Sequence, residues 1–289
     1  MTAGEPLDRK ALEAHPLPPV ADGDKETKGR ILVIAGSRDV PGAAMLTATS
    51  AMRVGAGKLR IATIESAAPY LGVSMREAMV VGLPEDEKGG FGADAVAKIR
   101  EDAANSDAVV AGPGMASGES CTPISEALLE CAPTLVLDAA LLHSLADVKD
   151  REPLRVKMPV LLPHSGELAS LLDCDEEAIE RDPIGCGRRA AKLYRSIVLV
   201  KGVISHVVTP DGCTWTYQGG APGLGVSGSG DVLAGIVGGL LARGAEPLDA
   251  LLWSVWLHGE AGAALARKIG PIGFLAREIA DELPALLPR

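Results

Sequence analysis

The chain has 289 residues and a formal net charge of −10, with 47% hydrophobic and 23% charged residues. These values are ordinary for a globular protein, and the length suits one large domain or two small ones. The acidic balance argues against a nucleic-acid partner, because a nucleic-acid surface needs a basic stripe. An anionic small molecule is compatible with this charge if backbone amides bind it.

The cysteines and the apolar segments indicate a cytoplasmic protein. None of the five cysteines has C-x-x-C spacing or a histidine cluster beside it, so we expect reduced and mostly buried thiols. The first 19 residues lack the apolar core of a signal peptide. Residues 250–266, the most apolar stretch, contain His258 and Glu260 and are short for a membrane span. We expect a buried helix there and no membrane partner.

Strands and helices are predicted to alternate through the first half of the chain. A polar lead-in covers residues 1–28, with a short helix near Asp8–Ala14. Strands are then predicted at 30–37, 58–64, 107–114, 134–139 and 158–167, and helices at 42–57, 92–105 and 122–132. Apolar strands that alternate with helices are typical of a parallel, doubly wound sheet. The sequence therefore predicts an α/β fold, with residues 29–289 forming one domain.

The pattern changes in the second half of the chain. Residues 196–220 hold three short β-like runs, separated by turns at Lys201-Gly202 and at 210–212. We expect these runs to be antiparallel strands at the sheet edge. Helices are predicted to follow at 231–242, 247–267 and 273–283.

Four turns follow predicted strands and contain glycine, proline or a carboxylate. In an open α/β sheet, ligands bind at the carboxyl ends of the strands. We therefore expect one crevice lined by GSRDVPGA (36–43), AGPG (111–114), LDAA (137–140) and PHSGE (163–167).

The segment GVSGSGD (225–231) places a flexible arch directly before a predicted helix, with Asp231 in its first turn. Glycines here cost backbone entropy, which suggests that bare amides are needed. The amides of residues 228–231 would suit a phosphate or a transition-state oxyanion. A carboxylate beside such an anion is repulsive unless it has a function, such as accepting a proton from a hydroxyl. The structural alternative is that Asp231 complements the helix dipole and the glycines form a turn.

Other polar residues have both a functional and a structural interpretation. His164 and Glu167 could face the crevice or cap a helix, and Lys201 could bind a phosphate or lie on the surface. Asp138 ends a strand and could hold a magnesium-bound water. We expect His258, on an apolar helix, to be a satisfied core histidine.

Two common nucleotide-binding motifs, the dinucleotide-binding fingerprint and the P-loop, are not assigned to this chain. Residues 223–228 match G-x-G-x-x-G, but they follow the predicted antiparallel region and open no strand–helix–strand unit. The chain contains no G-x-x-x-x-G-K-[ST], so it is not a P-loop enzyme.

The motifs in their order resemble those of the ADP- or ATP-dependent NAD(P)H-hydrate dehydratases, which belong to the ribokinase-like superfamily. The resemblance runs from about residue 28 to Pro284 and rests on VIAGS…PGAA, VVAGPG, VLDA, PHSGE, LVKG, GSGDVLAGIVGGLLARG and WLHGEAG. Ribokinase-like kinases share the arch, whereas PHSGE and GPG in this order are more specific to the dehydratases. The resemblance implies a three-layer α/β/α sandwich with a mostly parallel central sheet and antiparallel edge strands.

The resemblance also implies a reaction, in which the S epimer of hydrated NADH or NADPH is dehydrated to the reduced cofactor. The ring hydroxyl would be phosphorylated, with Asp231 accepting its proton, and loss of phosphate would restore the ring. The substrate-binding residues implied are Ala43, Gly112 or Gly114, His164 and Asp231. The nucleotide-binding residues implied are Lys201, Gly202, Val203, Ile204, Ser205, Gly228, Ser229 and Gly230.

The family further implies the co-substrate and the assembly. Free-standing bacterial members typically use ADP, so ADP is the expected donor, ATP is the alternative, and Mg²⁺ is expected with the phosphates. Related dehydratases form homotetramers, so a homo-oligomer is expected. Arg38 is a candidate for the ribose phosphate of NADPH hydrate.

The chain departs from the family pattern at four positions, which bear on the metal shell and the nucleotide preference. Ser227 replaces a glycine of the arch, Ala140 replaces an aspartate, Ala221 replaces an asparagine, and Ala263 replaces an aspartate. Two other functions are compatible with the same arch. One is a ribokinase-like kinase of a small-molecule alcohol, and the other is a non-catalytic nucleotide-binding protein.

Overall fold

The computed structural model describes residues 4–19, 25, 27–145, 156 and 158–288. Within them, one sheet has the strand order β1-β10-β9-β8-β7-β6-β5-β2-β3-β4. Neighbours from β8 to β4 pair in parallel, whereas β9 is antiparallel to β8 and to β10. The strands are β1 (Glu5–Pro6), β2 (Arg30–Ile34), β3 (Lys58–Ile64), β4 (Ala78–Leu83), β5 (Ala108–Ala111), β6 (Leu135–Leu137), β7 (Val160–Leu161), β8 (Ile197–Val200), β9 (Ser205–Val208) and β10 (Thr214–Tyr217).

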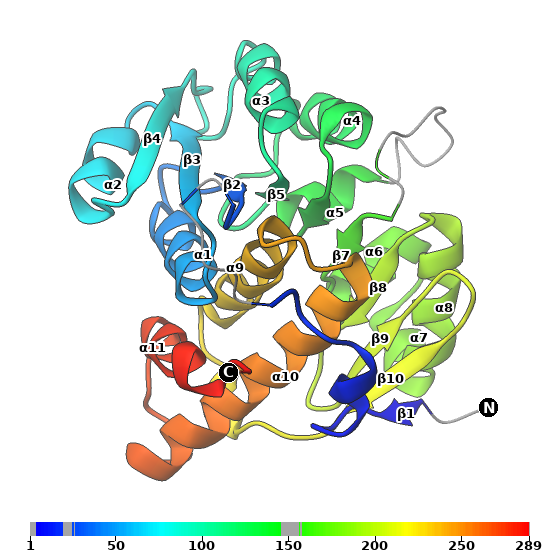
Figure 1. The fold of residues 1–289 in the computed structure, drawn as a ribbon. Coiled ribbons are helices and arrows are strands. Elements are labelled where there is room, and N and C mark those ends of the chain that lie inside the picture. Colours follow the sequence, from blue (N-terminus) through cyan, green and yellow to red (C-terminus); the bar gives the residue numbers. More distant parts are fainter. Residues whose placement is uncertain (1–3, 20–24, 26, 146–155, 157, 289) are drawn as a thin grey trace.

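Helices pack on both faces of the sheet (Figure 1). One layer holds α1 (Gly42–Arg53), α9 (Ser229–Ala242), α10 (Pro247–Lys268) and α11 (Ala276–Leu286). The other holds α3 (Ala95–Ala104), α4 (Cys121–Cys131), α5 (Ala140–Ser144), α6 (Ser165–Leu172), α7 (Glu176–Arg181) and α8 (Pro183–Leu193). The short helix α2 (Ala68–Ser74) packs on β3 and β4. The predicted α/β class and antiparallel strands are confirmed.

The lead-in contributes to the sheet. Strand β1 pairs in parallel with β10, and the short 3-10 helix Ala11–Ala14 buries Leu12. The indole of Trp253 in α10 donates to the carbonyl of His15 at 2.6 Å. The strand at residues 5–6 was not predicted, because two residues give no periodicity. The division of the chain between residues 28 and 29 stays a prediction.

Most predicted elements are present, but several short ones were missed. Helix α2 and strand β4 lie where no element was predicted, at the sheet edge farthest from β1. Helices α5 to α8 were not predicted individually either. The strand predicted at 158–167 is β7 followed by the start of α6, since Pro163 ends the extended run. The apolar segment 250–266 is the buried α10, and none of the described helices is both long and apolar enough to cross a bilayer.

The cysteines agree with the sequence analysis. None of the five forms a disulfide, and Cys121, Cys131 and Cys186 are buried.

The glycines of α9 allow this helix to pack closely on α1 and on the sheet. A Cβ added to Gly235 would lie 2.1 Å from the carbonyl oxygen of Thr47, and one on Gly238 would lie 2.1 Å from Val110 Cγ2. Real Cβ atoms do not approach so closely, so any other residue would displace the backbone of Thr47 at position 235 and the buried side chain of Val110 at position 238. The helix that starts at the arch is therefore held against α1 and β5 along its length.

We expect Gly235→Ala to lower the free energy of unfolding by about 3 kcal/mol, because its methyl group meets rigid backbone. Gly72→Ala is the matched control, since Gly72 is exposed in α2 and its Cβ would be 4.0 Å from Val80. This control should raise stability by roughly 0.5–1 kcal/mol through helix propensity. Urea unfolding followed by circular dichroism measures the free energy of unfolding of both variants. Equal effects would show that the close contact at Gly235 does not control stability.

Candidate active site

The GPG turn after β5 brings two neighbouring strand ends together. Gly112 has a φ of +118°, and a Cβ there would lie 1.8 Å from the carbonyl oxygen of Asp138. Gly114 has a φ of +63°, and its Cβ would lie 2.4 Å from the side chain of Ala43. The carbonyl of Pro113 accepts from the amide of Gly36 at 2.8 Å. Both glycines are thus required for the turn to lie between the loop before α1 and the end of β6.

A buried ion pair joins the ends of β6 and β8. The ammonium of Lys201 donates to Asp138 Oδ1 at 2.8 Å, and Glu167 Oε2 lies 3.8 Å from the same nitrogen. The Asp138 side chain is only 4% exposed. Burial raises the pKa of this carboxyl, and the positive charge of Lys201 opposes that rise. The lysine is therefore a cation held in place by two carboxylates.

The backbone beside this ion pair is strained. Ala139 has a φ of +50° and a ψ of −123°, which is rare for a residue with a Cβ, and its amide donates to Asp138 Oδ1 at 3.0 Å. Such strain persists only where the surroundings impose it, and it gathers at functional sites. The start of α5 is thus shaped to hold the Asp138 carboxylate.

The arch faces the ion pair. Gly228 precedes α9 with a φ of +89°, and a Cβ there would lie 2.5 Å from Leu46 Cδ1. A Cβ on Gly230 would lie 3.8 Å from the Lys201 ammonium and 3.9 Å from Asp138 Oδ2. The start of α9 therefore lies opposite the ends of β6 and β8, at the edge of the sheet where the crevice was predicted.

Asp231 lies in the first turn of α9 and is partly buried. Burial raises the pKa of its carboxyl to about 6, the negative charge of Asp138 adds to the rise, and Lys201 opposes it. Thr47 Oγ1 in α1 donates to the carbonyl oxygen of Asp231 at 3.1 Å, which fixes the first turn. A carboxylate with this pKa is ionised at neutral pH and is a better proton acceptor than an ordinary aspartate.

His164 caps a helix, as the structural interpretation expected. Its Nδ1 accepts from the amides of Gly166 at 3.0 Å and Glu167 at 3.4 Å, and Glu167 Oε2 accepts from the amide of His164 at 2.9 Å. The Nδ1 atom is an acceptor here, so the proton of the neutral ring is on Nε2. The side chain is 59% exposed, and its Nε2 lies 3.4 Å from Glu167 Oε1. His164 follows β7, the strand next to the one that ends at Lys201.

The remaining predicted residues lie at the rim or are already paired. Val203 is 97% exposed and Ile204 is 42% exposed, and Ser205 Oγ donates to the carbonyl of Gly202 at 3.2 Å. Arg38 binds Glu85 Oε1 at 2.8 Å and the carbonyl of Glu87 at 3.2 Å. The Arg38 guanidinium is thus held by the loop after β4, and its candidacy for a ribose phosphate gains no support.

The sequence analysis missed the partners of these residues. Asp138 and Lys201 were each singled out, but not as a pair. They pair because β6 and β8 flank β7 in the sheet, and no local sequence pattern reveals this strand order. The sequence analysis described His258 as a satisfied core histidine. The structure places its Nε2 at 3.0 Å from Ser229 Oγ, directly behind the arch.

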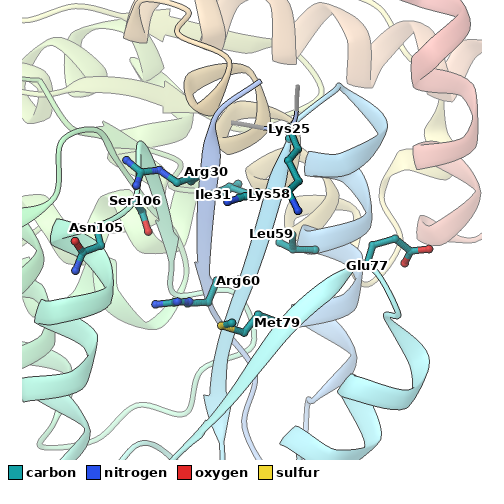
Figure 2. Close-up of a pocket in the computed structure, with 11 residues that line it drawn as sticks. Lys25, Arg30, Ile31, Lys58, Leu59, Arg60, Glu77, Met79, Asn105 and Ser106 are labelled. Carbon is teal, nitrogen blue, oxygen red and sulfur yellow. The ribbon is translucent and has the colours of Figure 1, made fainter. Parts of the chain in front are cut away.

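A pocket of about 560 Å³ lies at the opposite end of the sheet (Figure 2). Arg30 in its wall binds Asp107 at 2.9 Å, and Arg60 binds the buried Asp102. No predicted site residue is among those that line it, which are Lys25, Arg30, Ile31, Gly57, Lys58, Leu59, Arg60, Glu77, Met79, Asn105 and Ser106. The pocket is therefore separate from the crevice at the carboxyl ends of the strands.

Among the described residues, no group of three or more His, Cys, Asp or Glu side chains is arranged to hold a metal ion. Mg²⁺ commonly binds through one or two carboxylates together with substrate phosphates. Asp138 lies near Gly230 of the arch, and Glu167 contacts the same lysine as Asp138, so these two carboxylates fit such a shared site.

Comparisons with known proteins agree with this geometry. A sequence model of the NAD(P)H-hydrate dehydratase family matches residues 31–285. The chain is 47% identical, over 283 residues, to the ADP-dependent (S)-NAD(P)H-hydrate dehydratase of Xanthomonas campestris, and the match covers 96% of this chain and 94% of that one.

Solved structures give the same result. The ADP/ATP-dependent NAD(P)H-hydrate dehydratase of Bacillus subtilis, co-crystallised with ATP/Mg²⁺, superposes with a TM-score of 0.86 at 27% identity, covering 99% of this chain and 98% of that one. A ribokinase-like superfamily protein of Enterococcus faecalis superposes with a TM-score of 0.82 at 24% identity, covering 98% and 94% of the two chains, and so shares the fold. This chain belongs to the NAD(P)H-hydrate dehydratase family.

Proposed function

We propose that this protein dehydrates the S epimer of hydrated NADH or NADPH to the reduced cofactor and consumes ADP in doing so. The observation that carries the proposal is the crevice in which Gly230 of the arch faces the Lys201–Asp138 pair beside Asp231. The named activity of the Xanthomonas campestris relative supports the same reaction and the same donor.

In the proposed reaction, the ring hydroxyl oxygen attacks the terminal phosphorus of ADP. The new P–O bond forms as the bond to the AMP oxygen breaks, and Asp231 takes the hydroxyl proton. The amides of residues 228–231 and the Lys201 ammonium stabilise the negative charge on the transferred phosphoryl group. The ring C–O bond then breaks with loss of inorganic phosphate, and a proton leaves the neighbouring carbon to restore the double bond.

The residues around the crevice suit the two substrates. The hydrate would approach the backbone of the turn at Gly112 and Gly114 and of Ala43, whose side chain is buried. His164, which is exposed at the end of β7, would contact it from the next strand end. The nucleotide would lie along residues 201–205, where the exposed apolar side chains of Val203 and Ile204 can cover a base. Gly228, Ser229 and Gly230 would bind its phosphates through their amides.

Mg²⁺ bound with the nucleotide phosphates would neutralise their charge, with Asp138 and Glu167 as the nearby carboxylates. We further propose a homo-oligomer and a cytoplasmic location, in keeping with five cysteines that form no disulfide. A kinase of a small alcohol is the second candidate, and it would differ in releasing the phosphorylated product.

The first of three predictions from the proposed function concerns Asp231. With Mg²⁺ and the S-hydrate of NADPH, ADP should produce a rise in absorbance at the reduced-nicotinamide band. Asp231→Asn should lower kcat/KM by about 100-fold or more, because the proton acceptor is lost, while the Kd of ADP changes little.

The control for this variant is Asp249→Asn, since Asp249 is the acidic residue in the first turn of α10. If Asp231 only complemented a helix dipole, the two variants would behave alike. A rise in absorbance with ATP but not with ADP would support the same reaction and identify ATP as the phosphoryl donor. Accumulation of a phosphorylated alcohol would favour the kinase.

The second prediction concerns pH. Asp231 must be ionised to accept a proton, so kcat/KM should fall about tenfold per pH unit below its pKa of about 6. Asp138→Asn removes a negative charge that raises this pKa, so the acid limb should move to lower pH. Lys201→Met removes a positive charge that lowers it, so the limb should move to higher pH. Shifts in the same direction would refute the assignment of the limb to Asp231.

The third prediction concerns stability. The pKa of Asp231 is about 6 when folded and near 3.8 when unfolded, so protonation favours the folded state. The cost of ionising Asp231 therefore appears as pH rises from about 4 to 6 and is fully present above that range. Asp231→Asn should raise the free energy of unfolding by up to roughly 3 kcal/mol at pH 7.5 and by little near pH 4. Urea unfolding at the two pH values tests this, and a less stable variant at pH 7.5 would contradict it.

A further inference from the structure

His258 in α10 contacts the first helical residue of the arch through a single ring nitrogen. Its Nε2 lies 3.0 Å from Ser229 Oγ and 3.2 Å from the carbonyl oxygen of Ser229. Ser229 is buried, and it stands between Gly228 and Gly230 at the start of α9. The histidine therefore lies behind the amides to which the phosphoryl group is assigned, outside the set of residues that the proposed reaction uses.

The carbonyl contact determines the tautomer of the ring. A carbonyl oxygen can only accept a hydrogen bond, so Nε2 must carry a hydrogen to approach it at 3.2 Å. The same N–H then also points at Ser229 Oγ, and this oxygen accepts a hydrogen bond from it. An unprotonated Nε2 would place its lone pair against that of the carbonyl oxygen. The ring is also neutral at physiological pH. Burial, together with the charge of Lys201, lowers the pKa of His258 to about 4, although the hydrogen bond to the Ser229 carbonyl opposes this shift.

The tautomer in turn determines the direction of the serine hydroxyl. Because Oγ accepts from His258, its own hydrogen is not used in that contact. Among the described residues, Oγ has no other hydrogen-bond partner that could take this hydrogen. The hydroxyl hydrogen is therefore free to be donated to a phosphoryl group bound at the neighbouring amides of residues 228–231.

We propose that His258, as the neutral Nε2–H tautomer, is a positioning residue that makes the Ser229 hydroxyl a hydrogen-bond donor to the phosphoryl group held by the arch. This inference rests on the proposed function, since it needs a phosphoryl group at residues 228–231. It adds one side-chain donor to the backbone amides. Donors aimed at developing charge in such a site act mainly on the transition state.

The test is a double-mutant cycle on the full-length protein. Ser229→Ala and His258→Leu should each lower kcat at least about tenfold, with the KM for the hydrate and the Kd of ADP little changed. The double variant should fall no further than Ser229→Ala, because His258 acts through the hydroxyl. Losses that multiply in the double variant, or an unchanged kcat in His258→Leu, would overturn the proposal.

Two conservative variants and a control separate this role from folding. Ser229→Thr keeps the hydroxyl and His258→Gln keeps an N–H donor, so both should retain most of the activity. His206 offers a matched pair outside the crevice, because its Nδ1 lies 3.0 Å from Thr216 Oγ1. His206→Gln should leave kcat unchanged, whatever it does to stability.

The imidazole ¹⁵N shifts of the wild-type protein give a readout that does not depend on turnover. We expect a protonated Nε2 and an unprotonated Nδ1 on His258 between pH 6 and 8. An unprotonated Nε2 would refute this inference even in an active enzyme. A wild-type protein that forms no NAD(P)H would instead refute the proposed function, and the two failures are therefore distinguishable.

Discussion

The crevice depends on how two carboxylates and one ammonium group share a partly buried space. Asp138 and Asp231 would repel each other as ions, and burial alone raises the pKa of both. Lys201 is placed so that it binds Asp138 directly and lowers the pKa of Asp231 from a distance. One aspartate therefore remains paired as a structural anion, while the other keeps a pKa near neutrality and can exchange a proton.

The fold supplies this arrangement through close packing. Gly112 lets the turn after β5 touch the backbone of Asp138, and Gly235 and Gly238 let α9 lie against α1 and β5. These contacts bring the first turn of α9 over the ends of β6 and β8. The glycines of the arch thus leave the backbone amides accessible. The glycines farther along α9 allow the helix to pack closely enough to place that arch.

The sequence allowed much of this to be predicted, for reasons that are physical. Strand-end turns such as GPG and PHSGE are recognisable because glycine and proline end regular structure, and parallel strands collect those ends at one edge. The arch was recognisable because glycines beside an acidic first turn are costly without a ligand. The short edge elements α2 and β4 gave too little periodicity to be detected.

The pairings within the site could not be predicted from local patterns. Asp138 and Lys201 are brought together by the sheet order, with β7 between their strands. His258 meets Ser229 because α10 packs on α9, a contact between segments 29 residues apart. Both depend on tertiary packing, so the chain had to be seen folded before His258 could be linked to the arch.

In the proposed reaction, the ring hydroxyl leaves as part of a phosphate. The most direct measurement uses the S-hydrate labelled with ¹⁸O in that hydroxyl, with ADP and Mg²⁺, and follows the label by ³¹P NMR and mass spectrometry. We expect the ¹⁸O to appear in inorganic phosphate, with one labelled oxygen for each reduced cofactor formed. Label in water, with unlabelled phosphate, would contradict it and would mean that the hydroxyl leaves without being phosphorylated.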